Sequence, residues 1–306
     1  MPPVVETAEA LENAIESLAG GEGPVAVDAE RASGYRYGQS AYLVQLRRKG
    51  AGSFLIDPVP CPDLSELRTA LAGTEMVLHA ATQDLACLAE LGLVPDLLFD
   101  TELAGRLLGY PRVGLGTMVE TVLGFALEKG HSAADWSTRP LPADWLRYAA
   151  LDVELLVELR DALRAELDEA GKLGWAEEEF AAILSAPPKE PRQDPWRRTS
   201  GIHRLRTRRS LAVVRELWTA RDRIARDRDL SPGRVLPDAA IVEAALQLPK
   251  TPDDLSALPS FRGRNPRRHA AAWFRAVQRG GTLPDVSLPE HSLPGEGPPP
   301  AHRWAE

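Results

Sequence analysis

Residues 24–58 read PVAVDAERASGYRYGQSAYLVQLRRKGAGSFLIDP, and the prediction of the fold starts from this stretch. It contains three β-rich runs, at residues 24–30, 40–48 and 53–58, which are joined by short loops containing Gly and Ser. Consecutive strands with such short connections are typical of an antiparallel meander. The stretch therefore predicts three neighbouring strands of one sheet.

Helical patterns surround this meander. Apolar residues at helical spacing predict a helix over residues 5–20, and Gly20 and Gly21 would terminate it. Further elements are predicted downstream: helices at 64–73, 83–92, 101–109, 115–124 and 142–170, and a buried strand at 74–81. Strands and helices mixed in this order indicate an α/β fold, in which helices flank a mixed sheet.

The second part of the chain has a different character. Residues 185–201 contain four prolines among polar residues, which is typical of an extended linker. We therefore predict a first domain at 1–186, a linker at 187–202, an all-helical domain at 203–284 and a Pro-rich tail or second linker at 285–306. The predicted helices of the second domain lie at 210–229, 237–247, 252–258 and 265–279.

The net charge is distributed unevenly. The chain carries −8 overall, but residues 1–186 carry −16 and residues 187–284 carry +11. A basic domain beside an acidic one favours a polyanionic partner such as nucleic acid. The alternative is that arginine-rich helices only keep their exposed faces soluble.

Other features exclude several classes of protein. The N-terminus has no signal-peptide pattern, and no run is long and apolar enough to span a membrane, so we expect a cytoplasmic protein. Cys61 and Cys87 match no zinc-binding spacing, and we expect two buried or idle thiols in a reducing compartment. The hydrophobic fraction of 44% is ordinary for a globular protein.

Candidate functional residues lie in three segments. Asp28 and Glu30 are two apart on a predicted strand, so their carboxylates share one face. Asp84 lies where the strand at 74–81 meets the next helix. Each signal alone has an ordinary explanation, since surface carboxylates are common and an acidic residue in a first helical turn interacts favourably with the helix dipole.

The third segment contributes Tyr148 and Asp152. Their spacing of four places them on one face of a helix, one turn apart, although a partly buried tyrosine beside a charged helix face would show the same spacing. Together the four carboxylates offer the oxygen ligands that Mg²⁺ or Mn²⁺ prefers. Two such ions can promote displacement at a phosphodiester. The combination indicates a metal-dependent nuclease.

These motifs, in this order, resemble the tyrosine-bearing branch of the DEDD superfamily of 3′→5′ exonucleases, and within it the bacterial ribonuclease D family. The similarity lies in VAVDAE, LHAATQDLACLAELGL and HSAADWSTRPLPADWLRYAALDVELL, with a DW-x-x-RPL sequence at residues 135–141. Residues 207–245 and LSALPSF resemble the HRDC domain, a helical nucleic-acid-binding module. Ala29 stands where this family usually has Thr, a mild departure.

The resemblance implies a ribonuclease H-like (DnaQ-like) exonuclease fold followed by an all-α HRDC domain. It also implies that two Mg²⁺ or Mn²⁺ ions are bound by the four carboxylates (Asp28, Glu30, Asp84 and Asp152). Tyr148 would position the attacking water, since an unperturbed phenol is a poor base at neutral pH. The expected activity is 3′→5′ hydrolysis of single-stranded RNA ends, such as those of tRNA precursors and other structured RNAs, releasing nucleoside 5′-monophosphates.

Two alternatives stay open at this point: a DNA exonuclease of the same fold, and a non-catalytic nucleic-acid-binding scaffold. RNA and DNA exonucleases differ in their contacts to the 2′-hydroxyl, on which no motif here reports. Tyr35, Tyr37 and Trp136 are candidate surfaces for base stacking, with core packing as an equal alternative for Trp136.

Overall fold

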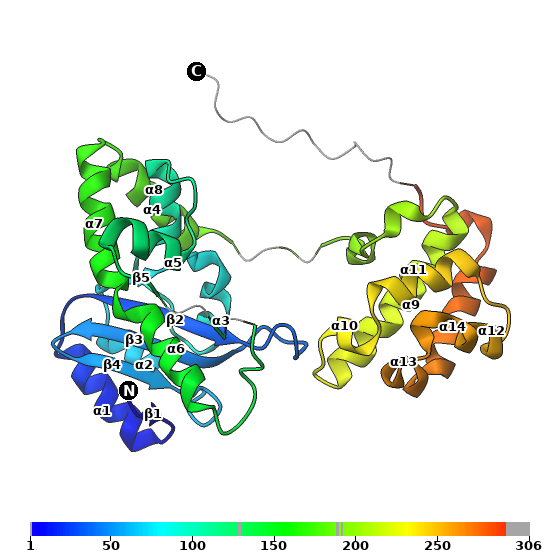
Figure 1. Cartoon of the computed structure of the whole chain (residues 1–306), viewed down its shortest axis with the longest axis horizontal. Helices are drawn as coiled ribbons and strands as arrows, with labels where there is room; N and C mark the ends of the chain where they lie inside the picture. The colour runs from blue at the N-terminus through cyan, green and yellow to red at the C-terminus, as the bar shows by residue number, and fades with distance from the viewer. Residues whose placement is uncertain (1, 128–129, 132, 188–189, 191, 292–306) are drawn as a thin grey trace. The chain divides into compact units, whose positions relative to one another are not determined.

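The computed structural model describes residues 2–127, 130–131, 133–187, 190 and 192–291 (Figure 1). The chain divides into two compact units. The first comprises Met1–Gly34 and Gln39–Lys189, and the second comprises Tyr35–Gly38 and Glu190–Glu306. Each unit has its own hydrophobic core.

A six-stranded mixed sheet forms the centre of the first unit. In chain order its strands are β1 (Val4–Val5), β2 (Glu22–Arg31), β3 (Ala41–Lys49), β4 (Gly52–Ile56), β5 (Glu75–Leu78) and β6 (Leu97–Asp100). In space the order is β1-β4-β3-β2-β5-β6. The antiparallel pairs β2–β3 and β3–β4 confirm the predicted meander, while β1, β5 and β6 run parallel to their neighbours.

Two strands were not predicted. Val5 belongs to β1 and pairs with Ile56, so the prediction of a helix from residue 5 was wrong at its start. The helix begins at Ala8, where the Thr7 hydroxyl caps it by accepting the N–H of Ala10. β6 is only four residues long and is a strand because it pairs with β5, a contact that local periodicity does not report.

Eight α-helices surround the sheet in the described part of the first unit. They are α1 (Ala8–Ala19), α2 (Ser65–Ala70), α3 (Leu85–Glu90), α4 (Thr101–Leu108), α5 (Leu115–Met118), α6 (Ala143–Glu154), α7 (Leu156–Glu169) and α8 (Leu173–Ser185). The single helix predicted over 142–170 is two helices, interrupted at Leu155 (φ −114°, ψ 10°). This interruption lets α6 pack across β2, β3 and β4, while α7 packs against β2 and β5.

The second unit is all-helical. Its helices are α9 (Arg208–Asp227), α10 (Pro232–Val235), α11 (Asp238–Gln247), α12 (Pro252–Ala257), α13 (Arg264–Arg268) and α14 (Ala270–Thr282). The long helix α9 packs against α11 and α14. Gly280 permits the close approach of α14, because a Cβ at this position would lie 2.6 Å from the Cα of Val213.

Two segments outside these helices join the second core. Trp196, within the stretch predicted as a linker, is buried among the apolar residues of this unit. The Tyr37 ring packs on the same core, its hydroxyl bonds the Asp222 carboxylate at 2.9 Å, and the Arg234 guanidinium lies 4.0 Å from the centre of the Tyr35 ring. Both tyrosines thus make intramolecular contacts, and their stacking on substrate bases stays a prediction.

Two further predictions concern the whole chain. Among the residues that the structure describes, none of the helices combines the length and apolarity needed to cross a bilayer. Cys61 and Cys87 are both buried and free, as the sequence predicted.

Candidate active site

The central strand β2 supplies two carboxylates. Asp28 and Glu30 alternate with the buried residues Val27 and Ala29, which face the opposite side of the sheet. β2 is paired with β3 on one side and with β5 on the other. The pairing with β5 involves only Val25 and Ala26, whereas the pairing with β3 includes Asp28 and Glu30. The two carboxylates therefore lie on the part of β2 that continues past its pairing with β5.

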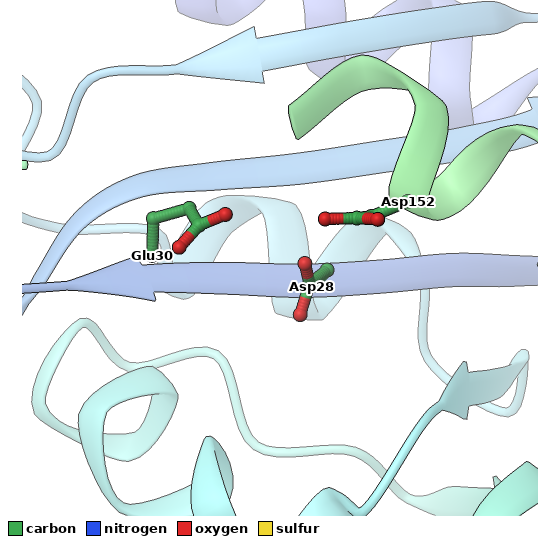
Figure 2. A group of neighbouring side chains, drawn as sticks. All are labelled: Asp28, Glu30 and Asp152. Carbon is green, nitrogen blue, oxygen red and sulfur yellow. The ribbon is translucent and has the colours of Figure 1, made fainter. Parts of the chain in front are cut away.

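Helix α6 brings a third carboxylate to the same place. One ligand oxygen from each of Asp28, Glu30 and Asp152 lies within 4.8 Å of the other two. Figure 2 shows Asp152 projecting from α6 towards the two side chains of β2. The structure thus brings together three of the four predicted metal ligands from segments more than 120 residues apart in the sequence.

The cluster places several carboxylates of like charge together in a buried site, and this raises their pKa values. Burial is the largest cause in each case, and it raises the pKa of Glu30 to about 9 and that of Asp152 to about 7. The negative charge of Asp28 adds to both shifts. Burial also raises the pKa of Asp28, against the lowering effects of the Ala29 backbone N–H and the Arg31 charge.

Asp84 lies beside this cluster. Burial and the charge of Asp28 raise its pKa to about 7. Its side chain makes no capping hydrogen bond to α3; instead, Oδ1 pairs with the Arg31 guanidinium at 3.2 Å. Asp84 thus lies at the N-terminus of a helix, as predicted, without capping it, and Arg31 is a neighbour that the sequence reasoning missed. The signal in the sequence was that Arg31 directly follows the Asp28-Ala29-Glu30 motif.

Tyr148 lies one helical turn before Asp152 and bonds its carboxylate. Burial, and then the charges of Asp152 and Glu30, raise the pKa of the phenol well above its ordinary value. The ring also has the His131 ring edge-on, with 5.9 Å between the ring centres. The hydroxyl thus keeps its proton at neutral pH and acts as a hydrogen-bond donor at the edge of the cluster.

The donor set fits divalent cations. It consists of carboxylate oxygens, the hard ligands that Mg²⁺ and Mn²⁺ prefer. Several buried carboxylates held this close repel one another when ionised, and a bound cation removes that repulsion. The residues present therefore suit a metal centre.

The segment before α6 is anchored by one buried ion pair. The Arg139 guanidinium binds both carboxylate oxygens of Asp57, each at 2.7 Å. Its remaining N–H groups bond the carbonyls of Tyr42, Trp136 and Thr138 at 2.8–2.9 Å. All five donors are satisfied, so the arginine of the DW-x-x-RPL sequence fixes the entry to the helix that carries Tyr148 and Asp152.

Two other residues have structural positions. The Trp136 side chain has no exposed surface, which excludes its predicted alternative role as a stacking surface. Nδ1 of His79 lies 2.9 Å from Oγ1 of Thr101, so this histidine links the end of β5 to the start of α4. A cavity of about 200 Å³ opens beside Glu30, lined also by Arg31, Ser33 and residues 133–134.

Comparisons with known proteins identify relatives of both units. A family model described as 3′-5′ exonuclease matches residues 2–168, and an HRDC domain model matches residues 210–277. The chain is 33% identical to ribonuclease D of Acidiphilium cryptum, covering 98% of this chain and 78% of that protein.

Solved structures are similar over both units. RNase D of Escherichia coli, described as an exoribonuclease involved in structured RNA processing, matches with a TM-score of 0.75 and 29% identity, covering 95% of this chain and 78% of that one. A protein from Bifidobacterium adolescentis matches with a TM-score of 0.87 and 41% identity, covering 94% and 76%.

Proposed function

Because the chain belongs to the ribonuclease D family of 3′-5′ exonucleases, and so is a 3′-5′ exoribonuclease, we propose that its acidic cluster is the centre at which RNA is hydrolysed. The observation that carries this proposal is the convergence of the Asp28, Glu30 and Asp152 oxygens within 4.8 Å. These carboxylates, with Asp84 beside them, would hold two divalent ions, Mg²⁺ or Mn²⁺. Such ions supply an acidified water and neutralise charge on the leaving oxygen.

The four carboxylates have distinct environments. Asp28 interacts with both Glu30 and Asp152, since its charge raises the pKa of each, and it would help these two residues to hold the ions. Asp84 is held by Arg31 in an ion pair. A cation at Asp84 would share this carboxylate with the Arg31 guanidinium, which occupies Oδ1.

Tyr148 has the role of a positioning donor. Its raised pKa excludes it as a general base near neutral pH, because it holds its proton there. From its place beside Asp152 the hydroxyl can orient the attacking water and a phosphate oxygen. The cavity next to Glu30 and Arg31 offers room for part of the terminal nucleotide.

The substrate we propose is RNA with a single-stranded 3′ end, including tRNA precursors and other structured RNAs trimmed at that end. The second unit supports this proposal through its HRDC match and its excess of basic residues, since residues 187–284 carry a net charge of +11. Such a charge attracts the phosphate backbone without regard to sequence. We propose that the acidic cluster holds the 3′ end of the RNA, so that nucleotides are removed from that end one at a time.

A nuclease assay tests the proposal. RNA labelled at its 5′ end, with a single-stranded 3′ tail, should be shortened stepwise in Mg²⁺ or Mn²⁺ and remain intact in EDTA. Asp28→Asn and Asp152→Asn should each abolish shortening while leaving the circular dichroism spectrum unchanged. Asp144→Asn is the matched control, because Asp144 is an exposed carboxylate on the same helix α6.

Three outcomes would contradict the proposal. Cleavage that persists in EDTA would exclude the metal mechanism, and full activity of Asp28→Asn would place the reaction elsewhere. Shortening of the matching DNA as fast as the RNA would contradict the assignment of RNA as substrate.

A further inference from the structure

Gln45 is a polar residue in the middle of the apolar strand β3. Its side chain has no exposed surface. Both polar atoms of its side chain, Nε2 and Oε1, lack a hydrogen-bond partner among the residues that the structure describes. A buried amide in this state destabilises the fold, and most buried polar groups in folded proteins are hydrogen-bonded.

The sheet register identifies the neighbours of Gln45. Directly across from it stand Asp28 on β2 and Leu55 on β4. Residues opposite one another in an antiparallel pair share a face, with Cβ atoms about 4.5–5.5 Å apart. Asp28 is therefore the polar group that the ladder places beside the Gln45 amide.

The neighbours of Gln45 along β3 do not compete for the amide. Two positions along β3 in either direction stand Leu43, which is apolar, and Arg47, whose guanidinium is engaged with glutamates of α6 and α7. Leu43 and Leu55 belong to one apolar cluster under α6. The same cluster contains Trp136, whose indole N–H also lacks a partner among the described residues but is a donor like the amide N–H of Gln45. Asp28 is the acceptor that the sheet register places directly opposite Gln45.

We propose that Gln45 is a positioning residue for the metal centre, which donates its side-chain N–H to the carboxylate of Asp28 when that carboxylate holds a divalent ion. A metal-binding carboxylate is ordinarily held by a further hydrogen bond that fixes its orientation. At the cross-strand spacing of directly opposed residues, rotation of a glutamine side chain can direct its amide to the carboxylate of Asp28. This inference rests on the proposed function, since it assumes that Asp28 is a metal ligand.

The place of Gln45 beside Asp28 also explains why a buried amide that lowers stability stands at this position. Leucine or methionine at residue 45 would fill a similar volume without burying unpartnered polar atoms, so stability alone favours an apolar residue there. A residue that lowers stability next to a metal centre is consistent with a contribution to binding.

The test uses the full-length protein and Gln45→Met. Titration with Mn²⁺ in the absence of RNA, followed by calorimetry, should show Mn²⁺ affinity weakened about 10- to 100-fold. The Tm in EDTA should stay the same or rise by about 2–4 °C, because two unpartnered polar atoms are removed. Leu46→Met is the control: this neighbour is equally buried but faces the other side of the sheet, and it should leave Mn²⁺ affinity unchanged.

The outcomes separate this inference from the proposed function. If the unsubstituted protein binds no Mn²⁺, the proposed function fails. If the unsubstituted protein and Gln45→Met bind Mn²⁺ equally, or if Gln45→Met loses affinity only together with a fall in Tm, the role assigned to Gln45 is overturned. Gln45→Leu is measured in the same way, so that failure of one variant to fold does not decide the result.

Discussion

Replacing Arg139 by methionine should damage both the stability and the activity of the nuclease unit. The substitution leaves the Asp57 carboxylate, only 3% exposed, with the Val59 N–H as its remaining hydrogen-bond partner. It also removes a donor from each of three backbone carbonyls. The buried charge then has no counterion.

The size of the effect follows from this environment. Removing one partner of a buried ion pair costs about 3–5 kcal/mol. The Arg139 side chain is 29% exposed, which places the expected loss at about 3 kcal/mol, at the lower end of that range. For a unit of this size the Tm should fall by about 6–12 °C. Because Arg139 anchors the entry to α6, kcat should fall by at least about tenfold even when the protein is folded.

Thermal unfolding followed by calorimetry, with kcat measured well below the Tm, checks both effects. Arg147→Met is the matched control, because Arg147 pairs with Asp144 at 2.6 Å in a setting where both side chains are at least 60% exposed. Such a pair contributes about 0.5 kcal/mol or less. If Arg139→Met and Arg147→Met shift the Tm equally, the argument from burial is refuted.

Three other predictions follow from the site and the helical unit. Tyr148→Phe should lower kcat by about 100-fold or more with RNA affinity unchanged, and an unchanged kcat would exclude its positioning role. Folding raises the pKa of the cluster carboxylates, that of Glu30 to about 9. These groups therefore bind more protons in the folded than in the unfolded chain above about pH 4.5. Stability in EDTA should therefore fall as pH rises from 5 to 9, and Mn²⁺ should reverse the fall; a Tm in EDTA that rises over this range would contradict the assigned shifts. Glutamine in place of the exposed α13 arginines (Arg264, Arg267 and Arg268) should make the dependence of log affinity on log salt shallower by about 2 if all three contact phosphate, whereas an unchanged slope would place the RNA elsewhere.

Local patterns predicted those parts of the site that one element determines. Asp28 and Glu30 share a face because strands alternate with period two, and Tyr148 and Asp152 adjoin because helices repeat every three to four residues. The convergence of the two segments depends on tertiary packing, and only the family resemblance indicated it.

The features that local patterns did not determine have a common physical origin. Asp84 lies at the start of a helix, yet its carboxylate bonds Arg31 rather than the helix backbone. Val5 is a strand residue because β4 lies beside it, and Trp136 is fully buried because α6 and the sheet enclose it. In each case a partner remote in the sequence decides the outcome, and local propensity does not describe that partner.

The short strand β1 gives the amino-terminal residues an influence on the distant acidic centre. The carbonyl of Val5 accepts the backbone N–H of Asp57 at 2.9 Å, and the side chain of Asp57 in turn holds Arg139. Fusing a bulky tag directly before Val4, or trimming the chain past it, would loosen the residue on which that arginine depends. Preparations that differ only at this end of the polypeptide are thus expected to differ in specific activity, even though the altered residues contact no substrate.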